Sequence, residues 1–356
     1  MDINLDLVEK YLNRKSSDMN DNSHYETVIC LYDFFCLNNI HICQKIKEKF
    51  NLTNKFHLIH NYNSITISEI NENFHYIINN ENNENNETNE TKYVLLEYNK
   101  RDHVDFDIFL INLPNPKLFI FHILDSYSFL LNSLLNLEQI NICFFNLSIK
   151  NILFGKNYKP ILQNFDTSLL IDKCCDMSYF LKIIDKISDY AYKPIEIHVI
   201  FYLIKNDENT LSFSMIDTIC NNFIQNSEIL NLFSQKYKEN YYRTSMDCLK
   251  KYINKPKNEI ITKILLYSNT WDNYELSILF LHMVGNITIT FSLKDTFINK
   301  LINILSKNLS PDPSKRDTLK NSLESFNKLF YEFTNWDYIN LIPKEKMSKL
   351  HENLFT

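Results

Sequence analysis

The spacing of apolar positions changes along the chain, and this change predicts the order of the elements. Over residues 26–50 apolar side chains recur at helical intervals, which predicts a helix. Residues 55–79 instead carry short apolar runs, which favour strands. Residues 92–97 are typical of a buried strand, and residues 117–137 of a long apolar helix.

Most of the chain after this helix is predicted to be helical, with breaks near Pro194, Pro256 and Pro311. Residues 79–91 contain only Asn, Glu and Thr. Such a segment has no apolar surface to bury, so it is predicted to be a disordered loop. A strand-rich beginning, a linking strand and a helical remainder together predict an α+β fold.

Composition narrows the class of protein. The chain has 356 residues, 45% of them hydrophobic, and a formal net charge of -6, so it can bury a large core and has no marked basic character for nucleic acid. The first ten residues are charged and lack an apolar run, and no apolar stretch of about 20 residues is evident. We therefore expect a cytoplasmic protein that binds neither nucleic acid nor membrane.

The cysteines and histidines give no sign of a metal site. The eight cysteines form no Cys-x-x-Cys pair, and no histidine lies at zinc-finger spacing. We expect reduced, mostly buried thiols and no bound metal. The many asparagines are typical of an AT-rich genome and carry little chemical information.

Residues 146–153, Asn-Leu-Ser-Ile-Lys-Asn-Ile-Leu, resemble the catalytic loop of protein kinases, Asp-Leu-Lys-x-x-Asn-Ile-Leu. The resemblance places Asn146 at the position of the Asp that accepts the substrate's hydroxyl proton, and Asn151 at the position of the magnesium-binding Asn. Ser148 stands where the family has a Lys. Phe144 replaces the usual His and is expected to pack in the core.

Asn164-Phe165-Asp166 resembles the Asp-Phe-Gly segment that follows the catalytic loop in that family. It comes thirteen residues after Asn151, about where the family places it. Asn164 then stands at the position of the metal-binding Asp, and Phe165 keeps the packing residue.

Three later segments resemble further kinase motifs in the family's order. Lys193-Pro-Ile-Glu196 is similar to Ala-Pro-Glu, residues 271–277 to Asp-x-Trp/Tyr-Ser-x-Gly, and residues 310–318 to Asp-Pro-x-x-Arg-x-Thr. By this resemblance Asp272 should cap the backbone of the catalytic loop, and Arg316 should pair with Glu196.

The resemblance spans residues 92–318 and implies a two-lobed protein-kinase-like fold. The expected domains are a reduced, divergent N-lobe over 1–91 with the disordered loop 79–91, a last strand and hinge over 92–101, and a mainly helical C-lobe over 102–356 with a large insertion at about 200–265. The insertion is expected to contain a helical stretch over 214–242. The hinge candidates for nucleotide binding are Leu96, Glu97 and Tyr98. The pattern as a whole resembles the kinase-like proteins of giant DNA viruses more than it resembles a cellular kinase.

Several parts needed for phosphoryl transfer are missing. No glycine precedes Gly155, so a glycine-rich phosphate loop cannot form, and no Val-Ala-x-Lys precedes the first predicted helix. Asn151 and Asn164 offer only neutral oxygens where Mg²⁺ prefers carboxylates. Asn146 carries an amide, which cannot accept a proton. We therefore expect a pseudokinase with no catalytic residues and no cofactor, and a nucleotide cleft filled by aromatic side chains.

The sequence thus predicts a catalytically inactive scaffold or interaction protein. It is expected to be viral, located in the host cytoplasm or the virion, and to bind protein partners through the insertion at 200–265. One alternative is an atypical, weakly active Ser/Thr protein kinase in which Asp166 or Asp172 captures the metal. A second alternative is a helical interaction protein without kinase ancestry.

Overall fold

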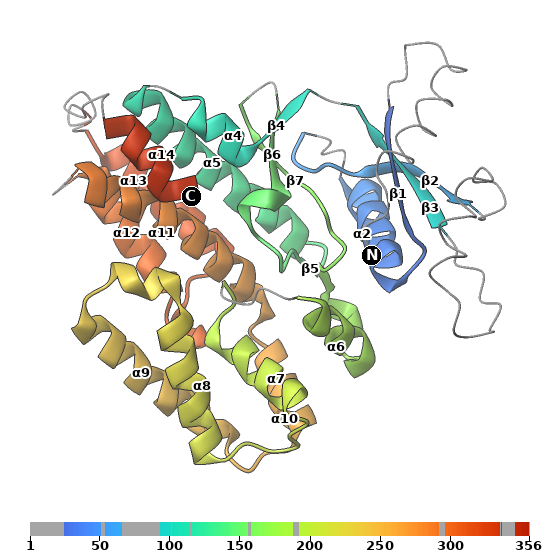
Figure 1. Cartoon of the computed structure of the whole chain (residues 1–356), viewed down its shortest axis with the longest axis vertical. Helices are drawn as coiled ribbons and strands as arrows, with labels where there is room; N and C mark the ends of the chain where they lie inside the picture. Colours follow the sequence, from blue (N-terminus) through green and yellow to red (C-terminus); the bar gives the residue numbers. More distant parts are fainter. Residues whose placement is uncertain are drawn as a thin grey trace, which may run out of the picture. The chain divides into compact units, whose positions relative to one another are not determined.

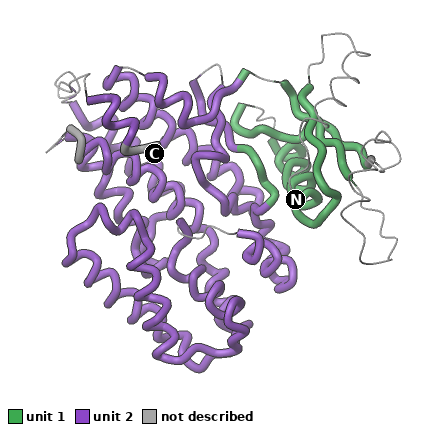
Figure 2. The backbone as a smooth tube through the Cα atoms, in the orientation of Figure 1, with its two compact units in different colours: residues 1–102, 163–166 green, residues 103–162, 167–356 purple. Residues whose placement is uncertain are grey.

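The computed structural model describes residues 25–50, 54–65, 93–100, 102–113, 115–155, 158–187, 192–291, 296–334, 336 and 346–355. The chain divides into two compact units (Figure 2): residues 1–102 with 163–166, and residues 103–162 with 167–356. The predicted disordered loop over 79–91 lies outside the described residues.

The smaller unit contains an antiparallel sheet and one helix (Figure 1). The strands lie in the order β1 (Tyr25–Leu31), β3 (Tyr93–Asn99), β2 (Ile59–Ile65), so β3 pairs with a neighbour on each side. Helix α2 (Phe34–Lys49) follows β1 and buries Ile42 and Ile46 completely.

The helix predicted over residues 26–50 begins too early, because its first part is strand β1. Residues 25–31 pair with β3 along their whole length. Asp33 then starts α2, since its carboxylate accepts the backbone N–H of Cys36 at 2.8 Å. Apolar residues in this stretch fit the period of either element, and the capping residue marks the true boundary.

The other predictions for this unit fall close to the observed elements. β2 lies within the span 55–79, the later part of which is outside the described residues. β3 covers residues 93–99, against the predicted 92–97. It forms the centre of the sheet, and its Val94 and Leu96 side chains are buried there.

Helices make up most of the larger unit. Four helices pack against α11 (Trp271–Phe291) to form a central group (Figure 1): α5 (Pro116–Glu138), α12 (Phe297–Asn308), α13 (Leu319–Glu332) and α14 (Met347–Phe355). The described strands of this unit are short: β4 (His103–Asp105), β6 (Ile152–Gly155) and β7 (Pro160–Leu162) in one sheet, and β5 (Ile142–Cys143) with β8 (Leu169–Leu170) in another. Two shorter helices, α4 (Phe106–Ile111) and α6 (Met177–Lys186), complete this part. The α+β character predicted from the sequence is therefore present, with helix predominating.

Helix α5 fits its predicted span of 117–137 closely. It also contains an apolar stretch of a length that was not evident from the sequence. Among the described residues it is the one helix whose length and hydropathy would allow it to cross a membrane. It packs against α11 and α13, and Ile123, Leu130 and Leu134 on it are fully buried. Its place in the core accounts for its apolar sequence.

The region of the predicted insertion is built of four helices. These are α7 (Ile195–Lys205), α8 (Phe213–Asn226), α9 (Gln235–Leu249) and α10 (Lys257–Leu265). The helical stretch predicted over 214–242 is interrupted by a short 3-10 helix, η4 (Glu228–Leu232), and α8 and α9 lie side by side (Figure 1). Residue 200, the predicted start of the insertion, falls inside α7, and α10 packs on α7.

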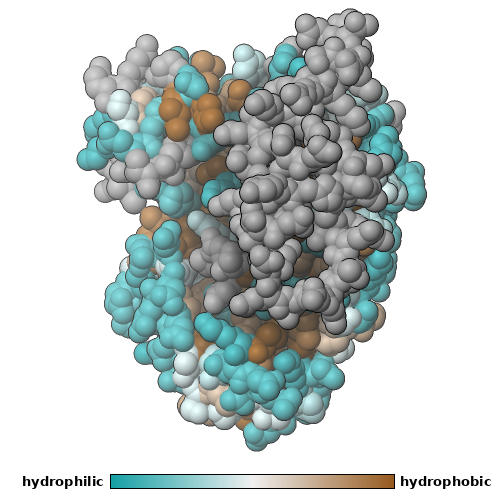
Figure 3. Space-filling model, turned by 45° about the vertical axis from the view of Figure 1, so that its right-hand side comes forward, coloured by the Kyte–Doolittle hydropathy of each residue, from teal (hydrophilic) through white to brown (hydrophobic). Residues whose placement is uncertain are grey.

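On the face shown in Figure 3, hydrophilic side chains predominate and are interrupted by hydrophobic patches. The exposed hydrophobic side chains include Phe213 at the start of α8 and Leu266 just after α10.

Candidate functional site

The segment that follows β5 is held by one buried carboxylate from α11. Asp272 lies in the first turn of α11 and is 4% exposed. Its two oxygens accept the backbone N–H groups of Phe144 and Phe145, each at 2.8 Å. Asp272 therefore caps this backbone as the sequence predicts.

Phe145 has a backbone conformation that side chains rarely adopt. Its φ of 53° lies in the left-handed region, which is uncommon for a bulky residue and needs support from its surroundings. Its N–H is fixed by Asp272, and its carbonyl accepts from Lys193 Nζ at 2.6 Å. The same ammonium lies 4.2 Å from the centre of the Phe145 ring, a favourable cation–π contact.

A buried ion pair completes the support of this segment. Lys193 Nζ lies 2.7 Å from Glu275 Oε1, and the two side chains are 3% and 0% exposed. The other oxygen of Glu275 accepts the N–H of Leu147 at 2.9 Å. Burial is the main effect on both carboxyls of this cluster and raises the pKa of Asp272 and of Glu275.

Sequence reasoning missed the roles of Lys193 and Glu275. Both residues lie inside segments that were recognised, but at positions where the kinase motifs have Ala and Ser. No signal for these roles was present in the sequence, because the kinase motifs have no charged residue at either position.

Asn146 and Asn151 lie together in this loop. The amide nitrogen of Asn146 donates to the hydroxyl of Thr167 at 2.9 Å, and that of Asn151 donates to the carbonyl of Asn146 at 2.8 Å. Asn151 is buried, whereas Asn146 and Ser148 are partly exposed. Both amides therefore serve as hydrogen-bond donors within the larger unit, a role that a carboxylate could not take.

Phe144 joins the same loop to Ser168, the residue before β8. Phe144 is fully buried, and its carbonyl accepts the hydroxyl of Ser168 at 2.8 Å. Phe144 thus packs in the core, the role that the sequence assigned to it.

Residues 164–166 belong to the smaller unit. Phe165 is fully buried there, with its ring centre 6.1 Å from that of Phe56. The carbonyl of Asp166 accepts from Asn38 Nδ2, on α2, at 3.0 Å. Asn164 is exposed and has a φ of 61°, a left-handed conformation that asparagine tolerates better than most residues.

A second buried pair joins α7 to the segment before α13. Arg316 donates through two nitrogens to the two oxygens of Glu196, at 2.6 and 2.9 Å. Arg316 also donates to the carbonyl of Ser310 at 2.8 Å. The predicted pairing of Arg316 with Glu196 is present, in the bidentate form that only an arginine can make.

The hinge candidates all lie inside β3. Leu96 is 3% exposed, and Glu97 and Tyr98 are partly exposed. Each has a register partner in both neighbouring strands. The partners of Leu96, for example, are Val28 in β1 and Tyr62 in β2. Burial raises the pKa of Tyr98, whose ring centre is 4.8 Å from that of His57. These residues therefore form the middle of a sheet in the described structure.

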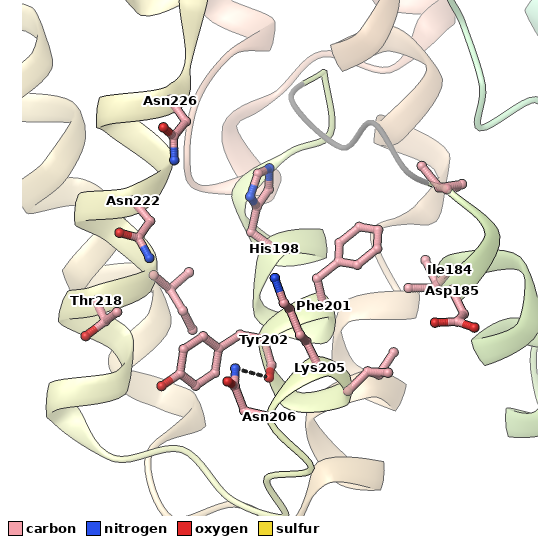
Figure 4. A pocket seen from close by; sticks show the side chains of 13 residues that line it. Ile184, Asp185, His198, Phe201, Tyr202, Lys205, Asn206, Thr218, Asn222 and Asn226 are labelled. Atoms are coloured by element: carbon pink, nitrogen blue, oxygen red, sulfur yellow. Dashed lines mark hydrogen bonds between the residues drawn. The ribbon is translucent and has the colours of Figure 1, made fainter.

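A pocket of about 990 Å³ opens between α6, α7 and α8 (Figure 4). Thr218, Asn222 and Asn226 line it from successive turns of α8, and Phe201 and Tyr202 line it from α7. The α8 side of the pocket therefore carries amide and hydroxyl groups, and the α7 side carries aromatic rings. Among the described residues, no three His, Cys, Asp or Glu side chains gather in a geometry that could hold a metal ion.

Comparison with known proteins gives a distant likeness among solved structures. No protein-family model matches the chain, and no curated protein matches it. Among solved structures, the chain is similar to the Legionella pneumophila LegK7 effector kinase, with a TM-score of 0.44 and 11% sequence identity, over 98% of this chain and 67% of that one. A likeness of this size carries no argument about activity, and the contacts within the chain must carry the functional conclusion.

Proposed function

We propose that the chain is a catalytically inactive protein with a kinase-like fold that serves as a scaffold for protein partners. The observation that carries this proposal is the support of the loop at 144–151. Asp272, Glu275 and Lys193 hold its backbone in a fixed and strained form, yet its side chains at 146 and 151 are amides. A catalytic loop without its catalytic carboxylate is the arrangement that the sequence motifs predict.

The contacts between distant motifs support the kinase-like fold. Asp272 and Arg316 make the two contacts that the resemblance assigns to them, to residues 128 and 120 positions away in the sequence. An unrelated helical protein that merely contained similar short motifs would have no reason to bring them together in these pairs. The alternative without kinase ancestry is therefore less well supported.

The strand that precedes the first helix lacks the usual phosphate grip. In protein kinases a Lys on the strand before the helix αC pairs with a Glu of that helix and contacts the phosphates. Here β1 is the strand before α2, and its sequence Tyr-Glu-Thr-Val-Ile-Cys-Leu contains no lysine. Among the described residues before α2, no lysine therefore occupies the position of this phosphate-binding Lys.

Charge at the loop argues in the same direction. Phosphoryl transfer depends on cations that neutralise the phosphates and on a base that takes the proton. A neutral amide at 146 cannot be that base, and loss of a general base typically costs on the order of 10²–10⁴ in rate. The amide nitrogens of Asn146 and Asn151 are moreover engaged with Thr167 and with backbone.

Phosphate transfer from radiolabelled ATP tests the proposal. The purified full chain, with Mg²⁺ or Mn²⁺ and generic acceptor proteins, is expected to transfer no more label than heat-denatured protein does. Transfer that disappears in Asn146→Ala and persists in the distant control Asn240→Ala would show that the loop is catalytic and would overturn the proposal.

For the scaffold role we propose that the pocket between α6, α7 and α8 binds an extended peptide segment. Asn222 and Asn226 lie four residues apart, so they recur about every 6 Å along α8. Alternate residues of an extended chain recur about every 6.6–6.8 Å. The amides can therefore pair with successive exposed peptide groups, whereas a bound helix would have no free backbone groups to offer.

A random dodecapeptide display library, selected on the full chain, tests this docking site. Synthetic copies of selected peptides should bind, and Asn222→Ala with Asn226→Ala should weaken binding at least tenfold, while Asn240→Ala should not. Methylating alternate backbone nitrogens of the peptide should weaken binding as well. Selection of no peptide, or binding insensitive to both changes, would exclude this use of the pocket.

The viral source, and a place in the host cytoplasm or the virion, stay predictions from the resemblance to kinase-like proteins of giant DNA viruses. Immunoblotting of purified particles and of host cytoplasm would test them directly.

A further inference from the structure

Two cysteines meet at the junction of β1 and α2. Cys30 is next to the last residue of β1, and Cys36 is the third residue of α2. Their sulfur atoms are 3.3 Å apart. Cys36 is 6% exposed and Cys30 is partly exposed, so the pair lies just below the surface of the smaller unit.

This geometry is close to that of a disulfide. A disulfide bond is about 2.05 Å long, so the two sulfurs need to approach by only roughly 1.2 Å. The connection between the two elements is the short turn at Tyr32 and Asp33. We infer that rotation of the two side chains can bring the sulfurs within bonding distance.

The surroundings favour Cys36 as the reacting thiol. The hydrogen bond between the two sulfurs lowers the pKa of Cys36 and raises that of Cys30. Cys36 also lies in the first turn of α2, where the backbone N–H groups favour negative charge, while the nearby Asp33 carboxylate raises the pKa of Cys36 and partly offsets this effect. The pair thus consists of one sulfur disposed to be a thiolate and one disposed to remain protonated.

We propose that Cys30 and Cys36 form a peroxide-sensitive dithiol that closes reversibly into an intramolecular disulfide between β1 and α2. The Cys36 thiolate attacks hydrogen peroxide, the O–O bond breaks, and Cys36 becomes a sulfenic acid with release of hydroxide. The Cys30 sulfur then attacks Cys36, the S–O bond breaks, and water leaves with the proton of Cys30. In total, one thiolate and one thiol are oxidised to the disulfide, and one peroxide is reduced to hydroxide and water.

The disulfide would act on the element that holds residues 164–166. Helix α2 carries Asn38, whose amide holds the carbonyl of Asp166. Among the described strands, β1 lies at an edge of the sheet and pairs with β3. Joining this edge strand covalently to the first turn of α2 would restrict the movement of α2, and with it the segment that contains Asn164.

The other cysteines of the described residues differ from this pair. Burial raises the pKa of Cys43 and of Cys174 to about 12, so both stay protonated near neutral pH. Cys175 is exposed but follows Cys174 directly, and a disulfide between neighbours in sequence is strained. Cys43, on the same helix as Cys36, and the exposed Cys175 are therefore suitable controls.

Peroxide treatment of the full chain, followed by alkylation and peptide mass spectrometry, tests the proposal without any variant. A cross-linked Cys30–Cys36 peptide should appear before other thiols are modified, and a thiol reductant should remove it. In Cys30→Ser the Cys36 sulfenic acid should persist and be captured by dimedone. In Cys36→Ser the Cys30 thiol should stay alkylatable, and Cys43→Ser and Cys175→Ser should form the cross-link as the wild type does.

The opposite results would overturn it. Cys30 and Cys36 that both stay alkylatable while peroxide oxidises Cys175 would mean that the close contact has no redox chemistry. A wild type that forms the cross-link, together with a Cys30→Ser variant that gives no dimedone adduct at Cys36, would show that Cys36 is not the thiol that first reacts with peroxide.

Discussion

Charged side chains of the larger unit are buried where they hold backbone. Asp272 and Glu275 each accept backbone N–H groups, and Lys193 donates both to a carbonyl and to Glu275. Burying such groups is costly unless each finds a partner, and here every named group does. The cluster therefore fixes the conformation of the loop at 144–147 more than it adds stability as an ion pair.

Removal of one member of the buried pair should destabilise the chain strongly. Lys193→Met leaves Glu275 buried without its cation, and we expect a loss of about 3–5 kcal/mol in the free energy of unfolding. The double variant Lys193→Met with Glu275→Gln should lose less than the single one. Urea unfolding followed by tryptophan fluorescence measures both, since Trp271 is fully buried beside Phe145.

An exposed pair provides the control for this experiment. Lys263 and Glu259 form an ion pair with side chains 45% and 38% exposed. Lys263→Met should therefore change stability by less than about 1 kcal/mol. Equal effects of the changes at 193 and 263 would mean that the buried pair does not support the loop.

Stability should also depend on pH through Asp272. Burial raises its pKa above the ordinary 3.8, so the folded chain binds this proton more tightly than the unfolded chain. The contribution of such a group is full below the unfolded-state pKa and is lost as pH rises through the folded-state pKa. The unfolding free energy of the wild type minus that of Asp272→Asn should therefore decrease as pH rises above about 4.

Glu259 gives the opposite sign under the same measurement. The hydrogen bond from Lys263 lowers the pKa of Glu259 below 4.5, so its contribution is present above the unfolded-state pKa and is lost as pH falls. The difference between the wild type and Glu259→Gln should widen as pH rises. Urea curves at several pH values measure both trends, and parallel trends for the two variants would contradict this account.

Elements were predictable from the sequence where one signal dominated. Helix α5 is long, strongly apolar and starts with Asn115 as cap and Pro116 at its first position, so its predicted span was nearly right. β1 was missed because Val28, Ile29 and Cys30 fit either a strand or a helix by period alone. The interruption of the predicted helix over 214–242 by η4 was missed for lack of a glycine or proline there.

A close approach between two elements anchors the insertion to the core. Gly285 on α11 faces Leu232 of η4, and a Cβ atom at 285 would come within 2.7 Å of Leu232 Cδ1. Gly285→Leu must therefore displace Leu232, and we expect a loss on the order of 1–3 kcal/mol. Gly285→Leu combined with Leu232→Ala should lose less than the sum of the two single changes, which a double-mutant cycle in urea measures.

Additive effects of these two changes would show that η4 does not rest on α11 at this point. The insertion would then be attached to the core elsewhere, and its docking role would need another geometry.

At the scale of the whole chain, the sequence predicted the α+β class and the pairing of distant motifs, but not the arrangement of the sheet. Short motifs with fixed residue types, such as those containing Asp272 and Arg316, can be matched one by one. The strand order β1-β3-β2 depends on contacts between residues about 65 positions apart, for which single residues give no signal. The pocket between α6, α7 and α8 was missed for the same reason, because its wall comes from three separate helices.

The claim on which the whole account depends is that amides at 146, 151 and 164 cannot hold a metal–nucleotide complex. Calorimetric titration of the full chain with ATP, with and without Mg²⁺, measures this directly. The account predicts no saturable heat that depends on the metal. Saturable Mg²⁺-dependent binding that Asn151→Ala and Asn164→Ala both weaken would contradict it.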